Sequence, residues 1–293
     1  MTDETTDGPG TTPGPLPPLG RLVRGTGPGL LLAHGAGGGI DANYGPVMDV
    51  LAERNTVVGP DYPGTGRSPA PPGVPLTLDG LADALVATAV EEGVETFAVA
   101  GYSLGVPVAV RAATRHPGRV TALALTAGFA RPNPRLRLLA EVWRELLAAG
   151  DGPAERRRLA GVMALLAFGA PALDALDRAA VDEAVRLGAG TVPAGTPAQL
   201  ALLLGGVDVA AELPALRVPT LVVSTTQDAL VTPYHHRRLA EAVPGARFVE
   251  LAAGHLPFVE CPAEWGALLR EFLDETAGTA ESAGADGDRP ASG

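Results

Sequence analysis

Residues 98–106 read Ala-Val-Ala-Gly-Tyr-Ser-Leu-Gly-Val, an apolar run that ends in a serine between two glycines and continues into a helical pattern. The pattern predicts a strand, a sharp turn and a helix, with Ser103 at the apex of the turn. Residues on both sides of such a tight turn are crowded, and glycine at 101 and 105 removes the side chains that would clash. The hydroxyl of Ser103 is therefore expected at the exposed tip of the strand, beside the backbone N–H of Leu104.

Apolar strands and helical patterns alternate on both sides of this turn. The strand-like runs lie at 29–33, 56–60, 96–101, 120–127, 220–225 and 246–251. The helical patterns lie at 43–54, 78–92, 104–116, 233–243 and 263–275. Short, continuously apolar strands that alternate with helices are typical of an α/β fold, in which a mostly parallel sheet is covered by helices on both faces.

The alternation is interrupted between residues 130 and 216, where helical patterns follow one another without a strand. They lie at 135–149, 155–168, 171–187 and 197–211. We interpret residues 131–216 as a helical lid whose apolar inner face lines a substrate pocket. The expected lining residues are Trp143, Met163 and Phe168, together with Tyr102 beside the serine. The alternative is an ordinary helical layer packed on the sheet.

The two ends of the chain differ in composition from the middle. Residues 1–18 are rich in Thr, Gly, Pro and acidic residues, and 276–293 are rich in Gly, Ala, Ser and acidic residues. Neither stretch has enough apolar surface to bury, so we expect both to be disordered tails. Residues 19–130 and 217–275 then form the core of the domain, with the lid at 131–216 between them.

Composition excludes several classes of protein. All 22 basic residues are arginine, and an enzyme without lysine cannot use a Schiff base, pyridoxal phosphate or a Walker-type phosphate loop. No strong basic cluster offsets the net charge of −11, which argues against a nucleic-acid partner. The acidic N-terminus has no basic n-region, so we expect no secretory signal, and the chain has one cysteine and no membrane-spanning run. We therefore expect a cytoplasmic monomer or homodimer that acts on a small molecule. The bias towards Ala, Arg, Gly and Pro indicates a GC-rich bacterial genome.

A serine hydroxyl becomes nucleophilic when a histidine accepts its proton and a carboxylate orients that histidine. The chain has five histidines. His116 is expected to cap a helix, and His34 ends a strand. The adjacent His235 and His236 are expected at a helix surface. His255 remains, in a loop after the last strand, from which it can reach back to the serine.

The carboxylate is expected on a loop after an earlier strand. Asp228 lies just beyond the strand 220–225 and just before a helix start. Asp208, inside the lid, and Asp61, in a turn-rich loop after another strand, are the alternatives. We expect Asp61 to support the site structurally rather than to take part in the chemistry.

Two N–H donors are needed where negative charge develops in the reaction. The N–H of Leu104 is one candidate. The second is expected from the turn His34-Gly35-Ala36-Gly37, because glycine lets the backbone approach a substrate closely. Ala36 is the predicted donor, and His34, Gly35 and Gly37 are the predicted supporting residues.

Together these motifs resemble the α/β-hydrolase-fold superfamily of serine hydrolases with a helical lid, over residues 19–275. The matching pieces are His34-Gly35 with its glycine turn, Asp61-x-x-Gly64-x-Gly66-x-Ser68, Gly101-Tyr102-Ser103-Leu104-Gly105, Asp228 and Gly254-His255. The resemblance implies a sheet of about seven to eight strands with the lid inserted after the sixth strand. It also implies that Ser103 is the nucleophile, His255 the base and Asp228 its orienting acid. Ala36 and Leu104 are the implied oxyanion donors.

The chain departs from the family pattern at two places. Only Arg21–Arg24 suggests a strand before residue 29, so the opening hairpin of the sheet is thin. Val106-Pro107 follows Gly105, where many members have a second small residue, and this change is expected to affect local packing alone.

The expected reaction is cleavage of an ester or thioester of a small, largely hydrophobic substrate through an acyl-enzyme. No metal or cofactor is expected, since no histidine and acid cluster has ligand spacing. One alternative is a natural-product enzyme of secondary metabolism with the same fold, acting as an eliminase, a cyclase or an editing thioesterase. An alternative of another class is a ligand-binding protein without turnover.

Overall fold

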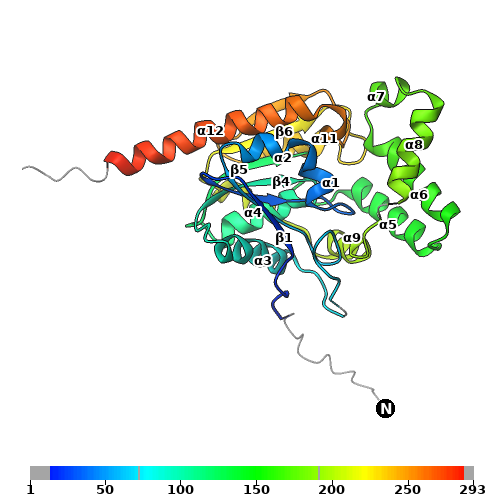
Figure 1. The fold of residues 1–293 in the computed structure, drawn as a ribbon, viewed down its shortest axis with the longest axis horizontal. Coiled ribbons are helices and arrows are strands. Elements are labelled where there is room, and N and C mark those ends of the chain that lie inside the picture. The colour runs from blue at the N-terminus through cyan, green and yellow to red at the C-terminus, as the bar shows by residue number, and fades with distance from the viewer. Residues whose placement is uncertain (1–13, 72, 191, 287–293) are drawn as a thin grey trace, which may run out of the picture.

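A computed structural model describes residues 14–71, 73–190 and 192–286. Its centre is a sheet with strand order β1-β3-β2-β4-β5-β6-β7 (Figure 1). The strands are β1 (Arg21–Arg24), β2 (Gly29–Ala33), β3 (Thr56–Pro60), β4 (Phe97–Tyr102), β5 (Val120–Thr126), β6 (Thr220–Thr225) and β7 (Arg247–Leu251). β1 pairs antiparallel with β3, and the other neighbouring pairs are parallel. The loops after the parallel strands therefore meet at one edge of the sheet.

Helices cover both faces of this sheet, as the sequence predicted. They are α1 (Ile40–Tyr44), α2 (Met48–Ala52), α3 (Leu78–Glu91), α4 (Gly105–Arg115), α10 (Pro233–Ala242), α11 (Pro257–Glu260) and α12 (Pro262–Asp286). In β4, Phe97 and Val99 belong to the core shared with α3, α4 and α10. Ala98 and Ala100 belong to the second core, which is shared with α1, α2 and α12. This alternation explains the continuous apolar run, since both faces of a central parallel strand are buried.

Among the described residues, five α-helices lie between β5 and β6 and form a lobe beside the sheet (Figure 1). They are α5 (Pro134–Ala148), α6 (Pro153–Ala167), α7 (Ala170–Asp174), α8 (Arg178–Ala189) and α9 (Thr196–Gly205). We call residues 131–216 the helical insertion. The prediction that it follows the sixth strand is wrong, because it follows the fifth strand of the described chain. The reason is that a single strand, β1, precedes β2 in place of a full opening hairpin.

The C-terminal tail was predicted to be disordered from residue 276, and this is wrong for 276–286. α12 continues unbroken to Asp286 (Figure 1). Extending a helix costs far less than nucleating one, and 276–286 contains four alanines and no proline. The packed first half of α12 therefore serves as the nucleus for its second half. The rest of the predicted tail, 287–293, lies outside the described residues.

The N-terminal tail prediction is also wrong in part. Residues 1–13 lie outside the described residues, but 14–18 are described and Leu16 packs against the core on the side of α3. A single leucine between prolines is enough to attach this short segment, because its neighbours have little conformational freedom to lose. Across the described part of the chain, no helix has both the length and the apolar character needed to cross a membrane.

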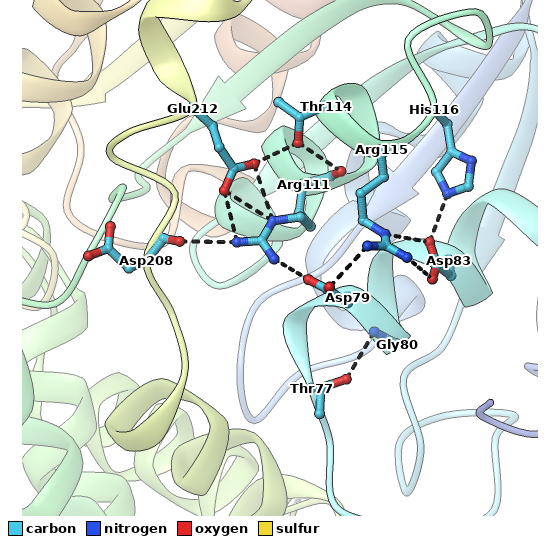
Figure 2. A network of polar contacts seen from close by, with 10 residues as sticks. All are labelled: Thr77, Asp79, Gly80, Asp83, Arg111, Thr114, Arg115, His116, Asp208 and Glu212. Atoms are coloured by element: carbon cyan, nitrogen blue, oxygen red, sulfur yellow. Dashed lines mark hydrogen bonds and ion pairs between the residues drawn. The ribbon is translucent and has the colours of Figure 1, made fainter. Parts of the chain in front are cut away.

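A network of arginine and acidic residues ties the end of the helical insertion to the helix that follows Ser103 (Figure 2). Arg111 in α4 donates to the carboxylate of Glu212 at 2.8 Å and to the main-chain oxygen of Asp208 at 3.1 Å. Arg111 also pairs with Asp79 at the start of α3, and Arg115 reaches the same carboxylate at 3.0 Å. The chain that returns from the insertion is thus held to both α3 and α4.

Candidate active site

Ser103 lies in a turn between β4 and α4, as the sequence predicted. Its φ is +53°, in the left-handed region that a residue with a Cβ rarely adopts. The turn is held because the N–H of Ser103 donates to Thr126 O of neighbouring β5 at 3.0 Å. A Cβ on Gly101 would lie 2.7 Å from Gly105 O, so the crowding that the sequence implied is present. Strain of this kind is stored where a side chain must be presented in one direction.

Ser103, His255 and Asp228 form one hydrogen-bonded chain. The Oγ of Ser103 lies 3.0 Å from Nε2 of His255, and Nδ1 of His255 lies 2.6 Å from Oδ2 of Asp228. Because a carboxylate accepts hydrogen bonds, we assign the proton to Nδ1, which leaves Nε2 free to accept the hydroxyl proton. The three residues come from the ends of β4, β7 and β6, and each is less than a tenth exposed. The structure thus brings together the three residues that the sequence predicted as a triad.

Asp228 is held firmly in this chain. Its Oδ1 accepts the N–H groups of Leu230 at 2.9 Å and Val231 at 2.8 Å. Its Oδ2 accepts the hydroxyl of Thr225 at 3.1 Å in addition to the imidazole of His255. Four donors around one buried carboxylate fix its orientation and compensate for the loss of water.

The glycine turn after β2 is fixed by side chains on both sides of Ala36. The N–H of Gly35 donates to Oδ1 of Asn43 at 3.0 Å, and the N–H of Gly37 donates to Oε1 of Gln199 at 2.8 Å. Gln199 belongs to α9, so the helical insertion holds this turn directly. In the part of the chain that the structure describes, neither Ala36 N–H nor Leu104 N–H has a hydrogen-bond acceptor.

His34 orients the peptide that carries the Ala36 N–H. Nε2 of His34 accepts the N–H of Tyr62 at 2.9 Å, so its proton is on Nδ1, which donates to Gly35 O at 2.8 Å. Gly35 C=O and Ala36 N–H belong to one trans peptide and point in opposite directions. His34 therefore fixes where the N–H points. Burial lowers the pKa of His34 to about 4, which keeps the ring neutral in this role.

The two alternative acids do not reach the site. Asp61 is fully buried and accepts the N–H of Ile40 at 2.8 Å and that of Arg67 at 2.9 Å. It thus supports the loop after β3, as expected. Asp208 lies in the segment that Arg111 holds (Figure 2).

A cavity of about 420 Å³ opens above Ser103 and His255. Its walls are mainly apolar side chains of α5, α6, α8 and α9, and they include Tyr102, Trp143, Met163 and Phe168, which the sequence proposed. None of its described lining residues is Asp, Glu or Arg. Such a cavity suits an uncharged, apolar group, because a charged group would lose its water without gaining a partner. Within the described ranges, no group of three or more His, Cys, Asp or Glu side chains is arranged to hold a metal ion.

Comparison with known proteins identifies the family of the chain. The family model described as "alpha/beta hydrolase fold" matches residues 28–262. The chain belongs to the α/β-hydrolase fold family.

Several relatives of this α/β-hydrolase carry hydrolase names. It is 30% identical over 253 residues to pyrrolizixenacetamide deacetylase of Xenorhabdus hominickii, covering 86% of this chain and 92% of the relative. It is 32% identical over 259 residues to a pimeloyl-[acyl-carrier protein] methyl ester esterase of Chromobacterium violaceum, covering 86% and 97%. A thermophilic esterase from Thermogutta terrifontis superposes with a TM-score of 0.74 at 27% identity, covering 88% and 93%. The chain is therefore an enzyme of the hydrolase class.

The sequence-based prediction for two histidines of this hydrolase was wrong. His235 and His236 were expected at a surface, but both are buried, His236 completely. α10 packs on β6 and β7 on one side, and His235 meets the ring of Phe129 on another. Nδ1 of His236 lies 3.2 Å from Oγ of Ser224, and its Nε2 lies 3.9 Å from Oδ2 of Asp228. Burial lowers the pKa of His236 to about 4.

A signal for the burial of His236 was present in the sequence. Leu239 and Val243 follow it at i+3 and i+7, which places all three on one helix face. Both apolar residues are buried in the core. The helical period therefore predicts a buried histidine here, whereas the adjacency of two histidines is uninformative.

Proposed function

We propose that this enzyme is a serine hydrolase that cleaves an ester or thioester of a small, largely hydrophobic substrate. Ser103 is the nucleophile, His255 the general base and Asp228 the acid that orients it. Ala36 N–H and Leu104 N–H hold the oxyanion. The observation that carries the proposal is the hydrogen-bonded chain from Ser103 Oγ to Asp228 Oδ2 at the floor of an apolar cavity.

Acylation begins when Oγ of Ser103 attacks the carbonyl carbon and its proton moves to Nε2 of His255. The carbonyl oxygen becomes negatively charged within reach of the two N–H donors, each of which typically contributes about 3 kcal/mol to such a transition state. The imidazolium is stabilised by Asp228. When the tetrahedral intermediate collapses, the bond to the leaving alcohol or thiol breaks, and Nε2 returns its proton to that group.

Deacylation repeats these steps with water. A water molecule gives one proton to Nε2 of His255 and attacks the acyl-enzyme, and the proton then returns to Ser103 Oγ as the acid leaves. The neutral cavity favours uncharged acyl groups, and the deacetylase and methyl ester esterase among the relatives support acyl chemistry of this kind. The true acyl group is expected to fill much of the 420 Å³ cavity.

Labelling with a fluorophosphonate probe tests the proposal. Wild-type enzyme is expected to be tagged at Ser103, and Ser103→Ala and His255→Ala are expected to abolish tagging. Ser224→Ala serves as a control, because Ser224 is a buried serine outside the chain to Asp228. An untagged wild type would refute the proposal.

Turnover of p-nitrophenyl esters from acetate to decanoate then defines the acyl preference. Isotope-labelled water identifies the reaction, because hydrolysis places one solvent oxygen in the released acid. Elimination or cyclisation places none there, so a product without label would favour those alternatives.

A further inference from the structure

Three segments that are distant in the sequence meet beside His255. They are the end of α6 with Gly169, the loop after β7 with Gly254, and Glu260 at the end of α11. The carboxylate of Glu260 accepts the N–H of Gly169 at 3.2 Å and that of Gly254 at 3.0 Å. We call this arrangement of Gly169, Gly254 and Glu260 the glutamate joint. It connects the helical insertion to the loop that carries the base.

The absence of side chains at both glycines makes room for this joint. A Cβ on Gly169 would lie 2.9 Å from Oε2 of Glu260 and would also clash with the side chain of Gln227. A Cβ on Gly254 would clash with the backbone of Gly169. The two backbones therefore touch, and their N–H groups converge on one carboxylate. Such close packing favours a single arrangement of Gly169, Gly254 and Glu260.

The joint acts on the backbone of His255. The N–H of His255 donates to Ala167 O, two residues before Gly169, at 2.6 Å. Its C=O accepts the hydroxyl of Tyr102 at 2.7 Å. Both polar groups of the His255 backbone are thus held, one by the helical insertion and one by the residue beside Ser103. Ala167 is the last residue of α6, and Gly169, whose N–H donates to Glu260, follows it by two residues.

We propose that Glu260 is a positioning residue for His255. It keeps the end of α6 on the base-bearing loop, so that Nε2 stays within hydrogen-bond reach of Ser103 Oγ. This inference rests on the proposed serine mechanism. Glu260 touches no reacting atom in this role, because it acts through Gly254 directly and through Gly169 and Ala167. The imidazole must remain within a fraction of an ångström of its position for proton transfer, and a displacement of about 1 Å typically costs about 100-fold in rate.

The geometry predicts a graded series of variants. Each of the two N–H groups lies 3.0 to 3.2 Å from both carboxylate oxygens of Glu260. Glu260→Gln keeps one acceptor oxygen but places an NH₂ group against the same donors. Glu260→Ala leaves both N–H groups without the carboxylate. The effect of the glutamine variant is therefore expected to lie between wild type and the alanine variant.

The experiment measures the rate of fluorophosphonate labelling of Ser103 and the kcat and KM for p-nitrophenyl butyrate, each per folded molecule. Glu260→Ala is expected to lower kcat and the labelling rate by about 10-fold to 100-fold, with KM changed less. Glu264→Ala is the matched control, since Glu264 is an exposed acid close by at the start of α12. It is expected to behave as wild type.

Hydrogen–deuterium exchange provides a second readout that does not require turnover. Peptides that cover 165–172 and 252–258 are expected to exchange faster in Glu260→Ala than in wild type or Glu264→Ala. Equal exchange, or faster exchange with unchanged labelling and kcat, would overturn the positioning role. An unlabelled wild type would instead count against the serine mechanism, and the exchange data would still decide whether Glu260 holds the two segments together.

Discussion

Replacing His236 by leucine tests the consequence of burying a neutral histidine beside Asp228. His236 is fully buried, and its Nε2 has no hydrogen-bond partner among the described residues. Burial lowers its pKa from 6.5 to about 4, so between these values the unfolded chain binds a proton that the folded protein does not. Stability therefore rises with pH across this window. Acidification from about pH 6.5 towards pH 4 therefore lowers the free energy of unfolding, because the unfolded chain takes up a proton at His236 and the folded protein does not.

The size of this loss of stability follows from the change in the pKa of His236. A change from 6.5 to about 4 corresponds to about 3 kcal/mol when fully developed, and to about 2 kcal/mol near pH 5. His34, with the same direction and cause, is expected to add about 2 kcal/mol near pH 5. The two histidines together make the wild type lose about 4 kcal/mol between neutral pH and pH 5, a large fraction of the stability of a typical domain.

Urea unfolding near pH 8 and near pH 5 measures this loss. His236→Leu is expected to lose about 2 kcal/mol less than wild type between the two pH values, because the group that takes up the proton is absent. Ser224→Ala is the control, since it removes the hydrogen bond to His236 but keeps the histidine. It is expected to lower stability at both pH values by about 1 kcal/mol and to keep the pH dependence. An identical pH dependence in His236→Leu and wild type would refute the reasoning.

Three further changes test other parts of the structure. Asp228→Asn is expected to keep the melting temperature within a few degrees but to lower kcat about 10,000-fold, because His255 loses the group that fixes its tautomer; near-normal turnover would place the acid elsewhere. Trp143→Ala widens the cavity and is expected to shift the preference for p-nitrophenyl esters towards longer acyl chains, whereas an unchanged preference would exclude Trp143 from the acyl-binding wall. Glu212→Gln weakens the pairing with Arg111 (Figure 2) and is expected to cost about 1 kcal/mol in urea unfolding. An unchanged midpoint would show that the network does not stabilise the fold.

Much of the sheet could be predicted because its signals are local. The apolar runs marked the strands, and the residues directly after them marked the loops that carry Ser103, Asp228 and His255. Local sequence patterns predicted less well those elements whose structure depends on packing against other elements. α12 continues past residue 276 because its first half is already packed on the sheet. The composition of the tail alone does not reveal this packing.

The residues that sequence reasoning missed act across long separations. Gln199 accepts the N–H of Gly37, which is 162 residues away. Glu260 accepts the N–H of Gly169, which is 91 residues away. Neither residue carries a motif, since any glutamine or glutamate could make these bonds if the fold placed it correctly. The hydrogen-bond partner, and not the residue type, gives each its role.

The order of apolar and polar residues by itself determined the α/β alternation, the turn around Ser103 and the identity of the residues at the strand ends. This is because helical and strand periods, glycine crowding and turn geometry act within a few residues. Tertiary structure alone decided the distances between the three loops and the shape of the cavity above them. These distances and this shape depend on the strand order in the sheet and on how the helical insertion docks. Both arise from contacts between segments that are distant in the chain, and the local sequence of one segment does not show which other segment it contacts. The 3.0 Å between Ser103 and His255 is therefore a property of the packed sheet and its insertion.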